Sequence, residues 1–184
     1  MILIKNAQKR ILKWDLSACI YLNQLSSDIK VARFFKFISR LGDGLFWLVM
    51  FVFTWSLQGL NYIIQLLYIL FFGSIGSLIY KILKRKTVRP RPYQVHQVII
   101  MGERPLDHFS FPSGHTLHAV MISSVLGWIQ PILLVLMLPF SILIALSRMI
   151  LGLHYPTDVL VGAGLGVLMA SLMIYFAPVF GVLL

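Results

Sequence analysis

His154 and Asp158 are the side chains of this chain best suited to covalent chemistry. Their spacing of four places them on one side of a helical start, and Pro156 suits the first turn of that helix. A carboxylate on one ring nitrogen fixes the imidazole tautomer and stabilises the charge that develops when the other nitrogen attacks phosphorus. An interfacial His–Asp cap pair would have the same spacing, so this pair alone does not decide the chemistry.

A second imidazole, His115, follows Pro112, Ser113 and Gly114. Ser113 is predicted to cap a helix, and Gly114 lets the backbone approach a ligand closely. The free N–H groups of such a helix start bind phosphate oxygens. His115 is then placed to protonate a leaving oxygen as a general acid. The alternative is a lone interfacial histidine.

Three cations complete this set of side chains: Lys84, Arg91 and Arg148. A phosphoryl-transfer transition state spreads negative charge over three equatorial oxygens, which guanidinium groups bind in pairs and a lysine binds as a point charge. The other cations near Lys84 are interpreted as side chains that snorkel to the membrane interface. These are Arg85, Lys86 and Arg89.

The composition is that of an integral membrane protein with a single domain, residues 1–184. Hydrophobic residues make up 59%, mean hydropathy is +0.87, and 12% of residues are charged. A soluble domain has about 25% charged residues. The net charge of +10 comes from cations that flank apolar spans without an aromatic-interleaved patch, so anionic lipids and a phosphate substrate are expected partners and nucleic acid is not. The single cysteine, Cys19, excludes an intramolecular disulfide.

An all-α, polytopic transmembrane bundle is predicted over residues 45–183. Five apolar segments are expected to span the membrane: 45–59, 62–83, 114–129, 132–152 and 156–183. The polar stretch 84–112 is the predicted active-site loop. Alternation of these spans places all the motifs on one membrane face. Gly162, Gly164 and Gly166 are interpreted as small residues that allow close helix packing.

Residues 1–42 precede this bundle and are more polar than the five apolar segments. Residues 11–25 are largely apolar, but Lys13, Asp15 and Asn23 interrupt them without forming a clean polar face. A second helix is predicted to open at Asp28, with one apolar and one basic side. Both helices could lie in the membrane interface or pack on the bundle. If the first one inserts, the bundle has six spans.

No metal or other cofactor is predicted. The six acidic residues are scattered and form no cluster in the sequence that could hold a divalent cation. They are Asp15, Asp28, Asp43, Glu103, Asp107 and Asp158. The remaining histidines, His96, His108 and His118, are interpreted as structural.

The motifs, in their order and spacing, resemble the signature of the type 2 phosphatidic acid phosphatase superfamily, which includes membrane lipid phosphatases and soluble vanadium haloperoxidases. The resemblance covers about residues 80–160 by motif and extends over the bundle by topology. It rests on Lys84 with Arg91-Pro92, on Pro112 to His115, and on Ser147-Arg148 with His154 and Asp158.

This resemblance implies a metal-independent reaction. His154 would form a phosphohistidine, Asp158 would orient it, and His115 would protonate the leaving group. Water would then hydrolyse the intermediate. The residues implied to bind phosphate are Lys84, Arg91, Arg148, and the backbone of Ser113 and Gly114.

The expected function is therefore hydrolysis of a lipid phosphate or diphosphate. Undecaprenyl diphosphate is the first candidate, because the chain is compact and has no added domain. The alternatives are phosphatidylglycerol phosphate, phosphatidic acid and lipid A phosphate, or phosphotransfer to a second lipid. A non-catalytic lipid-binding protein would not need the paired histidines. A haloperoxidase is disfavoured because the chain is short and apolar. No protein partner is inferred.

The two indications of membrane orientation disagree. The resemblance implies a multi-pass protein of the bacterial inner membrane whose site faces the periplasm. In the five-span arrangement all 16 Lys and Arg residues lie on the active-site side, and charge bias assigns that side to the cytoplasm. The resemblance is given the greater weight, so the site is expected on the periplasmic face.

Overall fold

The structure, a computed structural model, consists of helices and loops. It describes residues 2–184, and the side chains of all of these except residues 2–5, 7, 8 and 61; no strand occurs among them. The predicted all-α class is confirmed. The α-helices are α1 (Ile2–Gln24), α2 (Ile29–Gly42), α3 (Leu45–Gln58), α4 (Tyr62–Thr87), α5 (Pro92–Val95), α6 (Gly114–Ile129), α7 (Leu134–Ile150) and α8 (Pro156–Phe176). Short 3₁₀ turns cover Leu25–Ser27, Gly59–Asn61, Pro131–Leu133 and Ala177–Phe180.

Helices α6 and α8 pack closely at the centre of the bundle. A Cβ atom added at Gly162 would lie 2.5 Å from the Ser113 carbonyl oxygen, and one at Gly166 would lie 2.6 Å from that of Leu117. Only glycine allows this approach, so the predicted packing role of these two residues is confirmed. A Cβ atom added at Gly164 would have no neighbour within 4 Å, so that glycine is not needed for close packing. The close packing brings the starts of α6 and α8 together, and the Ser113 N–H donates to the Asp158 carbonyl at 3.0 Å.

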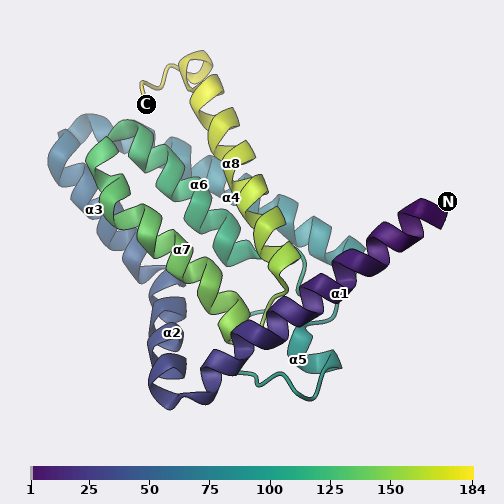
Figure 1. Cartoon of the computed structure of the whole chain (residues 1–184). Coiled ribbons are helices and arrows are strands. Elements are labelled where there is room, and N and C mark those ends of the chain that lie inside the picture. The colour runs from purple at the N-terminus through teal and green to yellow at the C-terminus, as the bar shows by residue number, and fades with distance from the viewer. Residues whose placement is uncertain (1) are drawn as a thin grey trace.

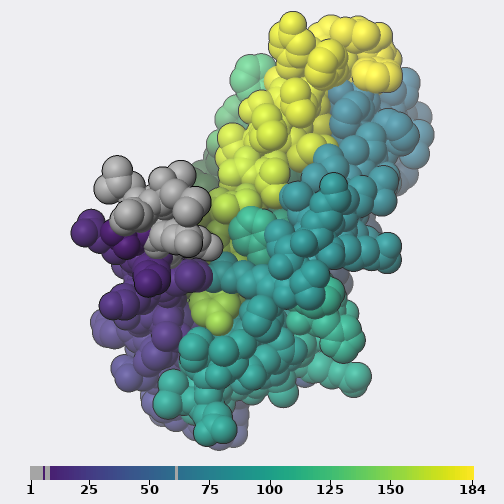
Figure 2. Space-filling model, turned by 90° about the vertical axis from the view of Figure 1, so that its right-hand side faces the viewer, coloured from purple at the N-terminus to yellow at the C-terminus, as the bar shows by residue number. Residues whose placement is uncertain are grey.

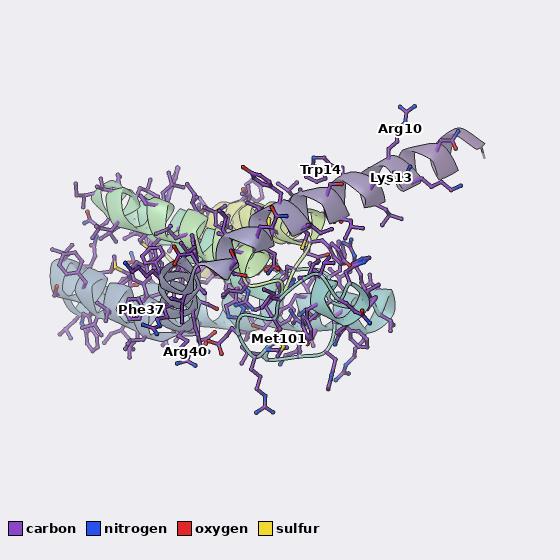
Figure 3. The ribbon with its side chains drawn as sticks, turned by 60° about the horizontal axis from the view of Figure 1, so that its bottom comes forward. Arg10, Lys13, Trp14, Phe37, Arg40 and Met101 are labelled. Carbon is purple, nitrogen blue, oxygen red and sulfur yellow. The ribbon has the colours of Figure 1, made fainter. Side chains whose placement is uncertain are left out.

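The N-terminal helices pack on the bundle at the end where α6 and α8 begin (Figure 1). Helix α2 lies against α7, and α1 contacts both α7 and α8. The Asp28 carboxylate accepts from the Lys30 N–H at 2.7 Å, which confirms the predicted start of α2. The first half of α1, which carries Arg10, Lys13 and Trp14, extends beyond the bundle (Figure 3).

The predicted five spans are not confirmed. Among the described residues, three helical segments are long and apolar enough to cross a membrane: Tyr62–Val95, Pro131–Ile150 and Pro156–Phe180. A fourth arises if α2 and α3, bent by 52°, form one broken span. Helices α3 and α6 have 14 and 16 residues, shorter than the roughly 20 residues that a hydrocarbon core requires. The chain is a membrane protein whose central helix α6 is surrounded by longer helices.

Candidate active site

A cavity of about 240 Å³ lies where α4, α6, α7 and the loops before α6 and α8 meet. Most of the residues singled out in the sequence line it: Lys84, Arg91, Gly114, His115, Arg148 and His154. These residues are up to 70 positions apart in the chain. The structure therefore brings the three motifs together around a single cavity, as their placement on one membrane face predicts.

His154 lies in the loop between α7 and α8, and only 1% of its surface is exposed. The Arg148 carbonyl accepts from the N–H groups of both Leu153 and His154 at 3.0 Å, which fixes this loop on the end of α7. The His154 Nε2 atom lies 3.3 Å from Nη1 of Arg91. Because a guanidinium group can only donate, Nε2 is an acceptor and the ring proton belongs on Nδ1. The nucleophilic lone pair thus faces the cavity cations.

Asp158 lies behind the His154 ring, in the first turn of α8, and is fully buried. Its Oδ2 atom is 3.7 Å from His154 Nδ1, too long for a hydrogen bond, and Nδ1 has no hydrogen-bond partner among the described residues. The same oxygen accepts from the Tyr155 N–H at 2.8 Å, which caps α8. Pro156 opens the helix, as predicted. At this separation the carboxylate can stabilise positive charge that develops on the ring.

The His154 ring is held in its neutral form. Burial, followed by the positive charges of Arg91 and Arg148, keeps the pKa of His154 well below its ordinary value. A neutral imidazole has a free lone pair near pH 7. The ring is therefore available as a nucleophile without prior loss of a proton.

Lys84 and Arg91 converge on a carboxylate that the sequence did not assign to them. Lys84 Nζ donates to both oxygens of Asp107, at 2.7 and 2.6 Å, and Arg91 Nη2 donates to Oδ1 at 2.7 Å. Burial alone would raise the pKa of Asp107, but the Lys84 hydrogen bond and both cations outweigh it and lower that pKa. The Asp107 carboxylate thus occupies the position between Lys84 and Arg91 at which phosphate oxygens are predicted to bind.

Arg148 has capacity left for a ligand. It is buried, and its Nη1 donates to the Ser39 hydroxyl at 2.6 Å. Its Nε atom has no hydrogen-bond partner among the described residues. A buried guanidinium donor without a partner is costly, and an anion in the adjoining cavity would satisfy it.

His115 pairs with Asp43, a residue that the sequence analysis treated only as part of a helix break. Nε2 of His115 lies 2.6 Å from Oδ1 of Asp43. The hydrogen bond with His115 lowers the pKa of Asp43, which lies in the turn between α2 and α3. The carboxylate orients the ring on the cavity wall.

Ser113 does not line the cavity. Its N–H is bound to Asp158, and its hydroxyl lies 2.9 Å from the Thr116 hydroxyl and caps α6. The predicted cap is confirmed, but the predicted phosphate-binding N–H is already used within the fold. Gly114 does line the cavity, beside the Tyr80 ring.

The structure contradicts the interpretation of Arg89 as a side chain that snorkels to the membrane interface. Its Nη1 donates to Asp158 Oδ1 at 2.6 Å, and its Nη2 donates to Asp15 Oδ2 at 2.5 Å. Arg85 and Lys86 are exposed, as interpreted. Helix α4 ends at Thr87, so the backbone turns and aims Arg89 inward. The sequence did contain one signal for this role: Arg89 and Arg91 are two residues apart, on either side of Pro90.

Comparison with known proteins identifies the family. The profile of the PAP2 superfamily matches residues 61–181, about two thirds of the chain. The chain belongs to the PAP2 superfamily. This match covers the helices from α4 to α8 and every cavity residue named above except Asp43.

Several PAP2 phosphatases resemble this chain in sequence. Phosphatidylglycerophosphatase B of Bacillus subtilis is 35% identical over 122 residues, which are 56% of this chain and 53% of that protein. Decaprenylphosphoryl-5-phosphoribose phosphatase of Mycobacterium tuberculosis is 37% identical over 87 residues, 46% of each protein. The chain thus spans about half the length of the curated relatives it matches.

Two crystal structures share the PAP2 fold of this chain. One is a transmembrane PAP2 type phosphatidylglycerolphosphate phosphatase from Bacillus subtilis, with a TM-score of 0.70 and 24% identity over 92% of this chain and 87% of the other. The other is Aquifex aeolicus LpxE, with a TM-score of 0.70 and 22% identity over 84% and 93%. At these identities the likeness establishes the fold.

Proposed function

We propose that the protein hydrolyses the terminal phosphate of a membrane lipid, with His154 as the nucleophile. The observation that carries this proposal is the position of His154 Nε2, 3.3 Å from Arg91 Nη1 and on the wall of a cavity shared with Lys84 and Arg148. A phosphoryl group held by these cations would present its phosphorus to the ring nitrogen.

The reaction has two balanced steps. His154 Nε2 forms a bond to phosphorus while the bond to the leaving oxygen breaks, and His115 gives that oxygen a proton. Water then attacks the phosphohistidine, His115 takes a proton from it, and the phosphorus–nitrogen bond breaks to release phosphate and His154. Arg91, Arg148 and Lys84 stabilise the equatorial oxygens in both steps.

A lipid substrate is supported by a second, apolar cavity of about 240 Å³ between α3, α4 and α6. It shares His118 and Ile122 with the candidate active site. Its other lining residues include Phe51, Ile69 and Met121. An acyl or isoprenoid chain can lie there while its phosphate end reaches His154. Both a lipid phosphatase and a lipid phosphotransferase would use this path.

A diphosphate end, as in undecaprenyl diphosphate, is the substrate that we place first. A third cavity, of about 390 Å³, adjoins the candidate active site and shares His115 and Arg148 with it. Arg40 and Arg104 also line it, although Arg40 is paired with Glu103 at 3.0 Å. A leaving group that itself carries a phosphate would meet these cations beside the proposed acid, His115. Phosphatidylglycerol phosphate is the second candidate, because a 35% identical relative bears that activity in its name.

We further propose that the chain is a single domain of the bacterial inner membrane and that its reaction needs no metal ion. The active-site segment was predicted over residues 84–112, but α4 extends to Thr87, so the segment outside that helix begins at residue 88. We place the site on the periplasmic face, as the resemblance of its motifs to those of this superfamily implies. Residues 1–42 supply eight of the 16 Lys and Arg residues. An anionic membrane surface would attract them on either face.

The test is phosphate release by the purified protein in detergent, in the presence of EDTA. The panel contains undecaprenyl diphosphate, phosphatidylglycerol phosphate, phosphatidic acid and lipid A phosphate. We expect release without added metal, inhibition by vanadate as a pentacoordinate mimic, and the highest kcat/KM for the diphosphate. Strong inhibition by EDTA would reject the metal-independent mechanism. Turnover that requires a lipid acceptor would identify a phosphotransferase.

A further inference from the structure

Helix α1 presents a buried polar face to the loop that carries His154. The face consists of Asp15, Cys19 and Asn23, spaced by four residues, and each is at most 3% exposed. Cys19 Sγ lies 3.9 Å from the His154 carbonyl oxygen. The Asn23 amide donates to the carbonyls of Ile100 and Ile150 at 2.9 Å. Figure 2 shows α1, in purple, side by side with the teal segment that follows α4. This face therefore reaches the candidate active site from outside the bundle.

Asp15 is the charged member of this face, and it is bound at both of its oxygens. Oδ1 accepts from the Thr157 N–H at 2.9 Å, in the first turn of α8. Oδ2 accepts from the Thr157 hydroxyl and from Arg89 Nη2, both at 2.5 Å. A carboxylate at a helix N-terminus is favourable, so Asp15 of α1 caps α8 from a distant part of the chain.

Arg89 connects Asp15 to Asp158. One guanidinium nitrogen donates to each carboxylate, and Nη1 also donates to the Thr157 hydroxyl at 2.8 Å. The Arg89 Cζ atom lies 4.1 Å from the centroid of the Tyr155 ring, which holds the guanidinium plane in place. Hydrogen bonds thus connect Asp15 through Arg89 to Asp158, whose Oδ2 lies 3.7 Å from Nδ1 of the His154 ring.

We infer that Asp15 and Arg89 are positioning residues for the proposed nucleophile, and that α1 thereby belongs to the catalytic apparatus. This inference rests on the proposed role of His154. Arg89 binds only Oδ1 of Asp158 and leaves Oδ2 directed at His154 Nδ1. Asp15 neutralises the Arg89 charge, so that Asp158 keeps its full negative charge for the ring. Without Asp15, Arg89 would neutralise Asp158 instead.

The direction in which each substitution should change the basicity of the His154 ring follows from the charges around it. Asp15, Arg89 and Asp158 together carry one net negative charge behind the His154 ring. On its cavity side the ring faces the cations Lys84, Arg91 and Arg148 and the imidazole of His115. Two carboxylates lie on that side as well, Asp107 bound to Lys84 and Arg91, and Asp43 bound to His115. Neither variant below changes these groups, and Cys19 of α1 contacts the His154 carbonyl oxygen and not the ring. Removal of the Asp15 charge leaves no net charge behind the ring, and removal of the Arg89 charge leaves two negative charges. The ring should become less basic in the first case and more basic in the second.

Asp15→Asn and Arg89→Gln test this inference, each with two readouts. The first readout is kcat and KM for phosphate release in detergent. The second is the pH at which the His154 ring titrates, followed by NMR of protein with labelled histidine and assigned with His154→Ala. For Asp15→Asn we expect kcat to fall on the order of tenfold with KM little changed, by analogy with residues that orient metal-ligating side chains. Its ring titration should move to lower pH, by up to about one unit.

Arg89→Gln should move the same titration to higher pH, the opposite direction, while kcat also falls because Asp158 loses its anchor. Titrations that move in the same direction, or that stay at the wild-type value while kcat falls, would reduce both residues to a structural role and overturn the inference. If one variant fails to fold, the direction of the shift in the other still decides.

Two controls separate the electrostatic effect from the docking of α1. Asp28→Asn makes the same substitution at an exposed carboxylate, which among the described residues accepts a hydrogen bond from the Lys30 N–H alone, and it should leave both readouts unchanged. Asn23→Ala loosens α1 without a change of charge. It should lower the thermal stability and leave the ring titration in place. Full turnover by His154→Ala would instead reject the proposed function itself, and that outcome is distinct from a failure of the Asp15 and Arg89 variants.

Discussion

The Oδ2 atom of Asp158 lies 3.7 Å from Nδ1 of His154, and its only hydrogen bond among the described residues comes from the Tyr155 N–H. This geometry predicts that Asp158 acts on the ring mainly through its charge. Asp158→Asn should lower kcat by between about 100-fold and 10,000-fold, the range seen when an orienting carboxylate of a catalytic histidine is neutralised. Steady-state phosphate release measures this loss, and a change below threefold would reject the role of Asp158.

A second prediction concerns His115 and the leaving group. If His115 supplies the proton, His115→Ala should lower kcat on the order of 100-fold or more for a lipid phosphate, whose leaving alcohol is basic. The loss should be much smaller for a nitrophenyl phosphate, whose leaving group needs no proton. The two rates are compared in the same detergent solution. Equal losses for both substrates would contradict the role of His115 as a general acid.

The third prediction concerns pH. Because burial, Arg91 and Arg148 keep the folded pKa of His154 well below 6.5, the ring stays neutral as the pH falls through 6.5. The unfolded chain takes up a proton there that the folded protein does not, so the free energy of unfolding should decrease as the pH falls below about 6.5. NMR titration of the labelled ring should find it neutral at pH 6. A ring that titrates at 6.5 or above would contradict this assignment.

Asp107 provides a fourth prediction, because it occupies Lys84 and Arg91 in this structure. A substrate phosphate must compete with that carboxylate for both cations. Asp107→Asn should therefore strengthen inhibition by vanadate severalfold, since a neutral amide competes less well. The matched control is Asp28→Asn, which changes an exposed carboxylate elsewhere. Weaker vanadate inhibition would instead show that Asp107 holds the two cations in their binding positions.

The sequence predicts the parts of this site that follow from helix ends. Ser113 caps α6 and Pro156 opens α8 because their backbone preferences are local. Gly162 and Gly166 of α8 were interpreted correctly for a similar reason, since close packing requires a missing Cβ, whereas Gly164 makes no such contact. The convergence of Lys84, His115 and His154 followed from the order of the helices along the chain.

The parts that sequence analysis missed depend on contacts between distant segments. Asp15 was treated as an interruption of an apolar helix, although its spacing from Cys19 and Asn23 is that of one helical face. Which partners such a face meets is decided by tertiary packing alone. Arg89 shares its charge and its neighbourhood with Arg85 and Lys86, and only the end of α4 at Thr87 separates it from them.

The five predicted spans are not confirmed, for a geometric reason. Hydropathy recognises residues 45–59 and 114–129 as apolar, but it does not show that α3 continues α2 across a bend of 52°. Nor does it show that α6, with 16 residues, lies among longer helices that can shield its ends. These helices are apolar enough to span a membrane, and their length is what leaves the prediction unconfirmed.

The central claim is that His154 carries the phosphoryl group, and rapid chemical quench with ³²P-labelled lipid phosphate tests it most directly. Wild-type protein, denatured in alkali during the first turnover, should carry a label that is stable in base and labile in acid, as expected for a phosphohistidine. His154→Ala should fold, bind the lipid and carry no label. A label retained by His154→Ala would contradict the account, and so would wild-type protein that turns over without ever becoming labelled.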